Sequence, residues 1–449
     1  MIDSLTLGLK EGTGISAYAR GTLGFLEASG HQTHVLYGAG SVAWHRLWPH
    51  SPSPLAFFQR VALGMPSLYP GGRLKRLWTL ARAVGIDLLA QRLGLYPGLQ
   101  TMARPATMDW REYGRLLPPA AVAWNSAMLF ERAQAYFRLT GRVFRFKAPE
   151  DVDVYHSTLP FPLMASNKPN VCTFHDIIPL VLPGVTHVDL PEHRRMCAAV
   201  LEGFDLAVAD SDHTRRDLLA EFGVLPGKVV VAHVPTDIAA TAGTLAPHEM
   251  KACLARHKLA AGGYLLALGS LEPRKNLVRL VRAYSEAGTS LPLVIVGKDG
   301  WMFEDIHRAI KPMVKSAGTA AETEARGKQV IRFDYLPPED VAVLLQHARA
   351  LVFPSLYEGF GLPVLEAMAL GCPVIASNTS SIPEIAGDAA LLVDPYSVAG
   401  ISRAIDQLCE DDGLCRQLAA RGLVQSSRFT AQVCRDQLLA AYRQAGAMN

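Results

Sequence analysis

The sequence predicts an α/β protein with two doubly wound domains, each built on a parallel sheet. The chain has 449 residues, which is room for two large domains at roughly 100–200 residues each. Short apolar runs alternate with amphipathic segments in both halves, which is the pattern of strand–helix–strand units. Glycine-rich turns follow several of these runs, and ligands bind at such strand ends in doubly wound sheets.

We expect the first domain to span residues 1–240. It opens with a strand, a glycine turn, a helix and a second strand, and regular alternation resumes near residue 152. Strand–helix–strand units of this size indicate parallel strands joined by right-handed crossovers. The expected strands are 4–9, 33–37, 152–156, 171–175 and 206–210, and the first helix is 15–28.

An irregular elaboration of this domain occupies about residues 41–149. It holds 15 Lys and Arg against 4 Asp and Glu, whereas the rest of the chain holds 29 against 37. Helices are expected at 74–93 and 126–139. Basic and aromatic residues gathered in one region indicate a membrane-surface face or an anionic ligand, and the alternative is a merely basic domain face. Five of the six tryptophans lie here: Trp44, Trp48, Trp78, Trp110 and Trp124.

The second domain is expected over residues 241–428, after an inter-domain crossover at about 236–263. Apolar positions 277, 280, 281 and 284 have the i, i+3, i+4, i+7 spacing of a helix. A last helix, 431–445, falls within a closing segment at 429–449. The expected strands are 264–268, 293–296, 330–333, 350–353, 374–376 and 390–393, and the expected helices include 277–286 and 304–316.

The composition excludes several classes of protein. A formal net charge of +3 excludes a strongly basic nucleic-acid binder. The seven cysteines are scattered without a C-x-x-C pair, which favours structural thiols in a reducing compartment. No run of 18 uncharged apolar residues occurs, and the first residues do not resemble a signal peptide. We therefore expect a cytoplasmic protein.

The first glycine turn, residues 12–17, matches G-x-G-x-x-A between a strand and a helix. A dinucleotide site also needs an acidic residue about 20 positions later for the ribose. None occurs between Glu27 and Asp87, so a dehydrogenase is disfavoured. Gly12 and Gly14 instead suit a loop whose amides approach a phosphate at a helix N-terminus, and the alternative is a plain tight turn.

A second cluster, residues 268–276, follows an expected strand and precedes a helix that Asn276 could cap. It contains Gly269 and two adjacent cations, Arg274 and Lys275. A planar fork and a point charge at the carboxyl end of a strand suit a diphosphate. The alternative is a solvated charge pair.

The third cluster, residues 354–369, is the most specific. Glu358 and Glu366 are eight positions apart, the first in a loop and the second expected in the first turn of a helix that Pro363 helps to start. Between them lie the backbone amides of Phe360, Gly361 and Leu362. Two carboxylates around an amide nest could hold the hydroxyls of a nucleotide sugar while the amides hold its diphosphate. The alternative is a capping Glu366 beside a surface Glu358.

With the downstream segments 371–377 and Pro383-Glu384, this E-x7-E pattern resembles the donor site of glycosyltransferase family 4. The resemblance implies the GT-B fold, a retaining transferase and no metal or other cofactor. It implies that the loop of Gly12 and Gly14 lies near the donor diphosphate, which Arg274 and Lys275 bind. It further implies that Glu358 contacts the sugar, Glu366 the ribose, and His175 the sugar from the first domain, so that His175, Glu358, Arg274 and Lys275 are the expected catalytic residues.

The resemblance also implies that the last helix crosses back to the first domain, which usually binds the acceptor. Segment 173–180 resembles mannosyltransferases of polysaccharide assembly, so GDP-mannose is the expected donor. The basic, Trp-rich region fits a lipid-linked acceptor and a peripheral contact with an anionic membrane. The alternatives are a nucleotide-sugar epimerase of the same architecture and a non-catalytic nucleotide-sugar-binding protein.

Three further groups are weighed from the residues alone. Asp176 could orient His175 or cap the segment that follows it. Asp151-Val152-Asp153 has the form of a D-x-D metal site, but it precedes a strand instead of ending one. No pair of carboxylates suits the nucleophile and acid of a glycosidase. The family mechanism instead has the acceptor hydroxyl attack on the face of the leaving group.

Overall fold

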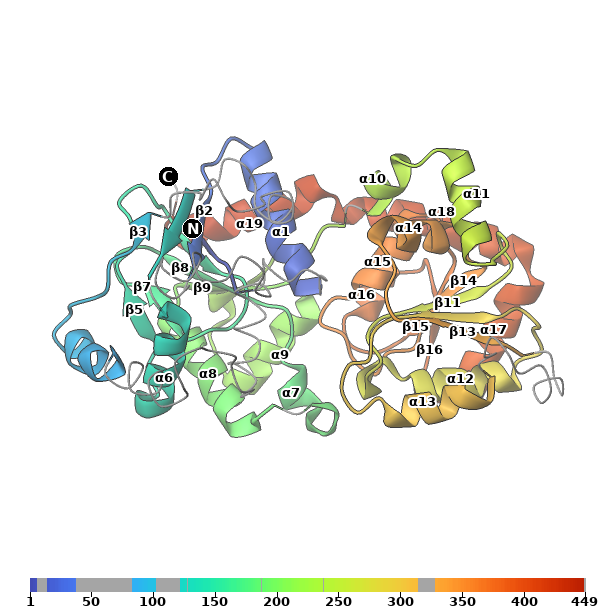
Figure 1. The fold of residues 1–449 in the computed structure, drawn as a ribbon, viewed down its shortest axis with the longest axis horizontal. Helices are drawn as coiled ribbons and strands as arrows, with labels where there is room; N and C mark the ends of the chain where they lie inside the picture. Colours follow the sequence, from blue (N-terminus) through green and yellow to red (C-terminus); the bar gives the residue numbers. More distant parts are fainter. Residues whose placement is uncertain are drawn as a thin grey trace, which may run out of the picture.

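The computed structural model describes residues 1–5, 14–37, 83–101, 122–126, 128–186, 188–236, 238–313 and 328–447. It contains two α/β domains that lie side by side (Figure 1). Five residues singled out in the sequence lie outside the described residues: Gly12, Trp44, Trp48, Trp78 and Trp110.

The first domain is built on an eight-stranded sheet with the order β10-β9-β8-β6-β1-β2-β4-β3. Every pairing in it is parallel except that of β3 with β4. A separate parallel pair joins β5 to β7. The strands are β1 (Ile2–Asp3), β2 (His34–Tyr37), β3 (Gln100–Thr101), β4 (Val122–Asn125), β5 (Phe144–Phe146), β6 (Tyr155–Ser157), β7 (Leu163–Ala165), β8 (Asn170–Phe174), β9 (Leu206–Ala209) and β10 (Val229–Val231).

Helices cover both faces of this sheet. On one face, α1 packs beside α19, and their apolar side chains join Val171 and Val208 of the sheet. On the other face, α6, α8 and α9 pack against Cys172 and Ala207. The helices are α1 (Gly14–Ala28), α6 (Leu129–Thr140), α7 (Ile178–Val181), α8 (Leu190–Gly203), α9 (Asp212–Phe222) and α19 (Ala431–Gln444), with a further helical segment at 83–92.

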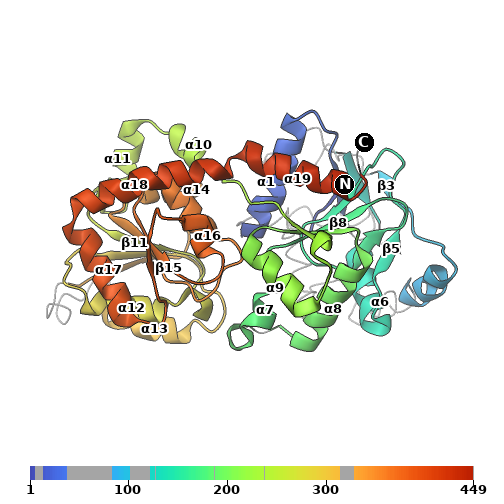
Figure 2. The same cartoon turned by 180° about the vertical axis from the view of Figure 1, so that it is seen from behind.

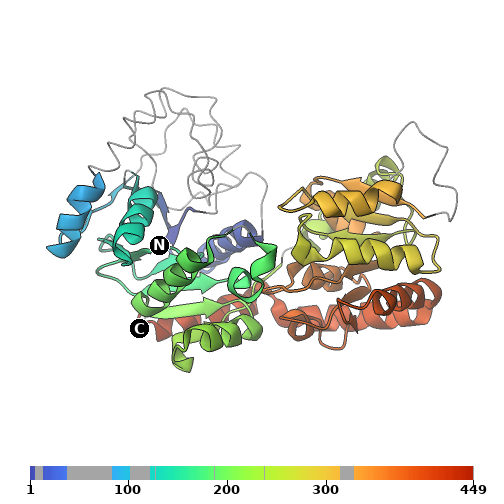
Figure 3. The ribbon, with the colours of Figure 1, turned by 90° about the horizontal axis from the view of Figure 1, so that it is seen from below.

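The second domain has a six-stranded parallel sheet with the order β13-β12-β11-β14-β15-β16. Alternate strand residues enter two separate cores, and helices lie on both sides (Figure 3). Its strands are β11 (Leu265–Leu268), β12 (Leu293–Val296), β13 (Val330–Phe333), β14 (Ala350–Phe353), β15 (Val374–Ser377) and β16 (Leu391–Val393). Its helices are α10 (Ile238–Gly243), α11 (Pro247–Arg256), α12 (Leu277–Glu286), α13 (Glu304–Ile310), α14 (Pro338–His347), α15 (Leu362–Ala369), α16 (Ile382–Ala386), α17 (Val398–Glu410) and α18 (Asp412–Ser426).

The chain crosses between the domains twice. Residues 232–236 lead from β10 to α10, and the short helix η5 (Ser427–Phe429) leads from α18 to α19. The two long helices run one after the other across the back of both domains (Figure 2). Among the described residues, none of the helices has the length and apolar character that crossing a bilayer requires.

Several predicted boundaries are wrong. The first described strand is Ile2–Asp3, where the buried carboxylate of Asp3 accepts the backbone N–H of Thr158 at 2.6 Å. The strand expected at 4–9 lies mostly outside the described residues. Helix α13 ends at Ile310 and not at residue 316, because Pro312 follows within the next turn. The expected crossover at 236–263 contains α10 and α11, which pack on α14.

A buried polar chain ties α19 to the first sheet. The Nδ1 atom of His156 lies 2.7 Å from the hydroxyl of Tyr442 in α19. Its Nε2 atom lies 2.7 Å from Thr173 Oγ1, which also meets the Tyr18 hydroxyl at 2.9 Å. Burial lowers the pKa of His156 to about 3, so the folded protein keeps this ring neutral.

This pKa predicts a component of acid instability. The unfolded chain protonates His156 near its ordinary pKa of 6.5, whereas the folded chain does not, so the stability is complete above that pH and falls as the pH drops towards 3. Between pH 7 and 5 the loss from this ring is about 2 kcal/mol. The free energy of unfolding in urea should therefore fall less over this interval in His156→Asn than in the wild type. The exposed His31→Asn is the control, and equal slopes in the two variants would contradict the assignment.

Candidate active site

A cavity of about 690 Å³ lies where the carboxyl ends of the two sheets face one another. Residues that follow β8 and β9 form the wall of the first domain. Loops after β11, β12, β13 and β14 form the wall of the second domain. The cavity brings together residues that the sequence singles out, namely His175, Gly269, Arg274, Lys275, Glu358, Phe360, Gly361 and Leu362.

The loop after β11 places a buried lysine beside the strand end. Gly269 has a φ of +132°, a region that side chains disfavour. A Cβ atom at this position would lie 3.0 Å from Cε of Lys275. The glycine therefore allows both the turn and the close passage of the lysine side chain.

The charged centre of the site is a cluster of two cations and two carboxylates. Arg274 Nη1 donates to Glu358 Oε2 at 2.5 Å, and Lys275 Nζ donates to Glu358 Oε1 at 2.7 Å. Arg274 Nη2 donates to Glu272 Oε1 at 2.5 Å. Lys275 also lies over the ring of Phe353, 4.7 Å from its centroid. Both cations are therefore fixed in position by protein groups.

Within the cluster, the opposite charges oppose the effect of burial on the pKa values of Glu358, Arg274 and Lys275. Burial alone would raise the pKa of Glu358, but Arg274 and Lys275 lower it to about 2. Burial would lower the pKa of Arg274, but the carboxylates of Glu358 and Glu272 raise it. Burial lowers the pKa of Lys275, and Glu358 opposes this shift. An anion that reached the cavity would meet two oriented cations in a water-poor setting.

Asn276 does not cap α12 with its side chain, which corrects our prediction. It occupies the N-cap position with a φ of 60°, but its amide donates to the carbonyl oxygens of Pro354 at 2.9 Å and Pro395 at 2.7 Å. The side chain thus joins the loop after β11 to the loop after β14. Because Glu358 belongs to the latter loop, Asn276 helps to hold the carboxylate opposite its cations.

The loop after β14 is shaped by hydroxyl contacts and a glycine. Ser381 Oγ lies 2.9 Å from the carbonyl oxygen of Glu358 and 2.7 Å from that of Phe360. Gly361 has a φ of +105° and precedes α15. The segment thus turns sharply and presents the helix start to the cavity.

Glu366 lies in the second turn of α15, not in the first turn as predicted. Its side chain is half-buried. Unlike Glu358, Glu366 is not among the described residues that line the cavity. The two carboxylates of the E-x7-E pattern therefore have different surroundings, and only Glu358 belongs to the charged cluster.

His175 lines the cavity from the first domain, but protein groups occupy both of its ring nitrogens. Nε2 lies 3.0 Å from the carbonyl oxygen of Thr158, which can only accept, so this nitrogen carries a proton. Nδ1 lies 3.2 Å from Asp210 Oδ2. The ring of Tyr18 packs edge-on against the imidazole at 4.9 Å. The imidazole is thus fixed in orientation and can present a ring edge to a ligand.

Sequence reasoning missed Asp210. Asp176 caps the next segment by accepting the N–H of Ile178 at 2.9 Å, and Asp210 is the residue that contacts His175. Burial raises the pKa of Asp210 to about 6, against the opposing effect of His175. Because Asp210 directly follows β9, the neighbour of β8, its place beside His175 could have been inferred from the strand order.

The domains touch at Gly359. A Cβ atom here would lie 1.8 Å from the carbonyl oxygen of His175, so only glycine permits the approach. The carbonyl oxygen of Gly359 accepts from Ser211 Oγ at 2.5 Å and from Thr214 Oγ1 at 3.1 Å. The charged cluster and His175 are thereby held on opposite walls of one cavity.

Other predicted residues lie elsewhere or beyond the description. Gly14 begins α1. Trp124, in β4, donates its indole N–H to His34 Nδ1 at 2.9 Å, so this tryptophan is used inside the fold. Asp151 and Asp153 line a smaller pocket of about 150 Å³ on the other side of the first domain.

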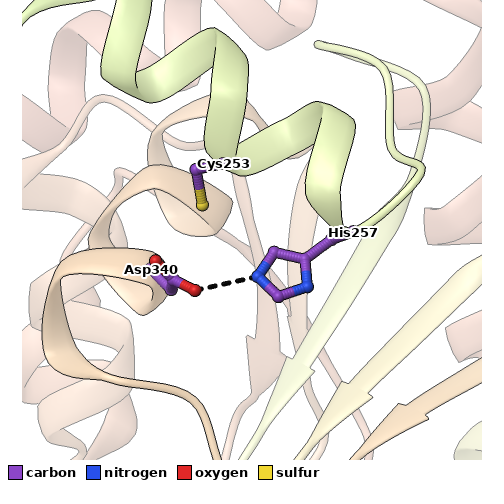
Figure 4. A group of neighbouring side chains, drawn as sticks. All are labelled: Cys253, His257 and Asp340. Atoms are coloured by element: carbon purple, nitrogen blue, oxygen red, sulfur yellow. Dashed lines mark hydrogen bonds and ion pairs between the residues drawn. The ribbon is translucent and has the colours of Figure 1, made fainter.

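One other group of described residues has the spacing of metal ligands. Cys253 of α11 and His257, which directly follows this helix, face Asp340 of α14 (Figure 4). Both carboxylate oxygens of Asp340 are already paired, one with His257 Nε2 at 2.9 Å and one with Arg256 Nη2 at 2.8 Å. Burial raises the pKa of the Cys253 thiol, which disfavours the thiolate that binds metals. We assign no metal to this group.

Two family models match the chain. The model for glycosyl transferases group 1 matches residues 258–424, and the model for glycosyltransferase family 4 matches residues 108–240. The chain is 34% identical over 280 residues to the O-antigen chain mannosyltransferase B of Escherichia coli, which covers 61% of this chain and 70% of the relative. It is 28% identical over 287 residues to the Escherichia coli serotype-specific mannosyltransferase WbdA, but it covers only 33% of that protein's length.

Solved structures with low sequence identity share the fold. A sucrose-phosphate synthase from Thermosynechococcus elongatus has a TM-score of 0.62 with 17% identity, over 99% of this chain and 98% of that one. The Anabaena protein HepE, in complex with UDP and glucose, has a TM-score of 0.57 with 17% identity, over 84% of this chain and 97% of that one. The architecture of the present chain is accordingly GT-B.

The close approach at Gly359 gives a prediction. Alanine at this position would clash with the His175 carbonyl oxygen, so the domains of Gly359→Ala should separate. The N–H groups of Asp212 and His213 donate to the carboxylate of Glu384 in the second domain, and they should then exchange with deuterium faster than in the wild type. Gly24→Ala is the control, because nothing lies within 4 Å of a Cβ atom there. Unchanged exchange at both amides would refute the tight contact.

Proposed function

Because the chain belongs to glycosyltransferase family 4, we propose that it transfers mannose from GDP-mannose to a lipid-linked saccharide with retention of configuration. The family assignment makes it a glycosyltransferase of the GT-B fold. The mannosyl donor is supported by the likeness to the O-antigen mannosyltransferase, of which the chain covers 70%. The retaining course is carried over from the resemblance of the donor-site residues.

The observation that carries the proposal is the charged cluster on the cavity wall. Arg274 and Lys275 are fixed within 2.7 Å of Glu358, and the start of α15 adds a helix N-terminus beside them. Fixed cations and backbone dipoles stabilise the charge that develops on a departing diphosphate without reorganising during the reaction. These groups can stabilise the leaving group by themselves, and the proposal uses no metal.

In the proposed reaction the bond between the sugar C1 and the diphosphate oxygen breaks, and a bond forms from C1 to the acceptor oxygen. The proton of the acceptor hydroxyl passes to the departing phosphate on the same face of the sugar. His175, oriented by Asp210 and Thr158, would lie against the sugar from the opposite wall. Glu358 would hold the two cations in register and contact the sugar hydroxyls.

Thermal denaturation with GDP-mannose, UDP-glucose and ADP-glucose tests the donor. A ligand at 100 times its Kd adds about 2.7 kcal/mol of stability. We expect GDP-mannose to raise the melting temperature of the wild type and of Lys251→Ala, whose lysine is exposed on α11. Lys275→Ala should lose most of this shift, because it removes one cation and leaves Glu358 with a poorer partner.

Two outcomes of this test contradict the proposal. If GDP-mannose stabilised Lys275→Ala as much as the wild type, the charged cluster would not be part of the donor site. If only another nucleotide sugar raised the melting temperature, that nucleotide sugar and not GDP-mannose would be the donor. Incubation of the protein with the stabilising nucleotide sugar, without an acceptor, distinguishes a transferase from an epimerase. An epimerase would convert the nucleotide sugar, whereas a transferase would not.

The acceptor and membrane part of the proposal rests on the helical segment 83–92. It lies at the end of the first domain that is remote from the second domain (Figure 1). Ile86, Leu89 and Leu93 follow the i, i+3, i+7 spacing of one helix face and are 60%, 62% and 63% exposed. Gln91, on the opposite side of the helix, bonds to the backbone of Arg145 in β5 at 2.7 Å, so the helix packs on the domain through its other face, and Arg92 of the same segment is exposed.

Exposed apolar side chains on a helix that also carries an exposed arginine suit the surface of an anionic membrane, where a lipid-linked acceptor would be presented. Flotation with vesicles that contain phosphatidylglycerol should recover the wild type at low salt and less of it at high salt. Leu89→Glu should abolish flotation. Leu225→Glu, at a side chain that is 79% exposed elsewhere in the same domain, should not. If both variants float like the wild type, the segment does not contact the membrane.

A further inference from the structure

The hinge of the molecule is formed by two chain segments that lie in contact. His233 belongs to the first crossing, residues 232–236, and Phe429 belongs to the second, η5. Their rings pack edge-on, with centroids 5.1 Å apart and planes at 85°. The backbone N–H of His233 also donates to Oε1 of Gln437 in α19 at 3.0 Å. A single histidine thus joins both crossings to the helix that returns to the first domain.

The same histidine contacts the loop that carries the charged cluster. Its ring lies 6.1 Å from that of Phe360, which lines the cavity. Its Nε2 atom lies 3.3 Å from Oε1 of Glu384 in α16. Neither His233 nor Glu384 is among the described lining residues of the cavity, so any effect on transfer must act through other residues.

Glu384 connects this hinge to the first domain. Its Oε1 accepts the backbone N–H of Asp212 at 2.9 Å, and its Oε2 accepts that of His213 at 3.2 Å. These N–H groups belong to the first turn of α9, where amides lack intrahelical partners and a negative charge is favoured. Burial would raise the pKa of Glu384, but His233 and the two amides lower it, which keeps the carboxylate charged.

The start of α9 also contacts the cavity wall. Ser211 and Thr214 donate to the carbonyl oxygen of Gly359, as described above. Glu384 and Gly359 therefore meet the same helix end from the second domain. All of these bonds join groups of different domains, so they exist together only while the domains are closed.

We infer that Glu384 and His233 are positioning residues for the transfer reaction, because they fix the closed arrangement that sets His175 opposite the charged cluster. Their side chains are 23% and 20% exposed, so water can replace the lost bonds when the domains open. Such contacts bias an equilibrium between two arrangements more than they stabilise either domain. The inference rests on the transferase activity of the family and not on the proposed donor or acceptor.

The test compares kinetics and shape in the full-length protein. Glu384→Ala should lower kcat by about tenfold and change the donor KM less than twofold, because chemistry requires the closed geometry while donor binding uses the second domain. Glu384→Gln retains an oxygen that can accept one amide and should fall between Ala and the wild type. The matched control is Glu339→Ala, which removes an exposed glutamate from the first turn of α14 in the same domain.

Two further measurements separate positioning from stability. Glu384→Ala combined with His233→Ala should be no slower than Glu384→Ala alone, because the two residues act as one unit. Small-angle X-ray scattering of the ligand-free protein should show a larger radius of gyration for Glu384→Ala than for the wild type and Glu339→Ala. This measurement uses no nucleotide sugar, so its result does not depend on the identity of the donor.

Three results would overturn the inference. One is a kcat like that of the control, and another is an additive loss in the double variant. The third is an unchanged radius of gyration together with a lowered melting temperature, which would make Glu384 an ordinary structural contact.

Discussion

The arrangement of the active site depends on one electrostatic constraint, the burial of Glu358 between Arg274 and Lys275. A buried carboxylate without partners would take up a proton, and a buried lysine without a partner would lose one. Placed together, they remain charged, and each fixes the geometry of the others. This requirement explains the roles of Gly269, Asn276 and Ser381. These residues shape the loops after β11 and β14 so that the opposite charges meet. The cluster has no net formal charge, because two cations, Arg274 and Lys275, balance two carboxylates, Glu272 and Glu358. It would therefore act on an anion through the fixed orientation of its cations and not through a broad positive field.

On the opposite wall of the cavity, contacts with protein groups likewise fix the position of His175. His175 is held by Thr158 and Asp210, and the approach at Gly359 sets its distance from the second domain. Fixed groups on two walls make the cavity competent only when the walls are in register. Under the proposed function, the contact at Gly359 would thus matter for activity, because it determines how closely the two walls approach.

Much of this could be predicted from the sequence. In the second domain the strands that begin at Leu293, Val330 and Ala350 have the predicted bounds, because each is an apolar run, interrupted only by Arg332 in the second of them. The family and the GT-B fold followed from Glu358, Glu366 and the cations near residue 274. The pairing of Glu358 with both cations and the true contacts of Asn276 could not be predicted, because they join loops more than 30 residues apart. The place of Asp210 beside His175 follows only once the order of the strands is known. Local patterns show which residues carry chemistry, but not which of them neutralise one another.

The return of α19 to the first sheet has a consequence for the synthesis of the protein. The core of the first domain includes Leu438 and Tyr442, which leave the ribosome after all strands of the second domain. The second domain is continuous in sequence and can fold while the first still lacks one of its covering helices. Domains usually fold in the order of synthesis, whereas here the domain that begins the chain is completed last. Until then the ring of His156 lacks the hydroxyl of Tyr442, and α1 lacks its neighbouring helix on that face of the first sheet.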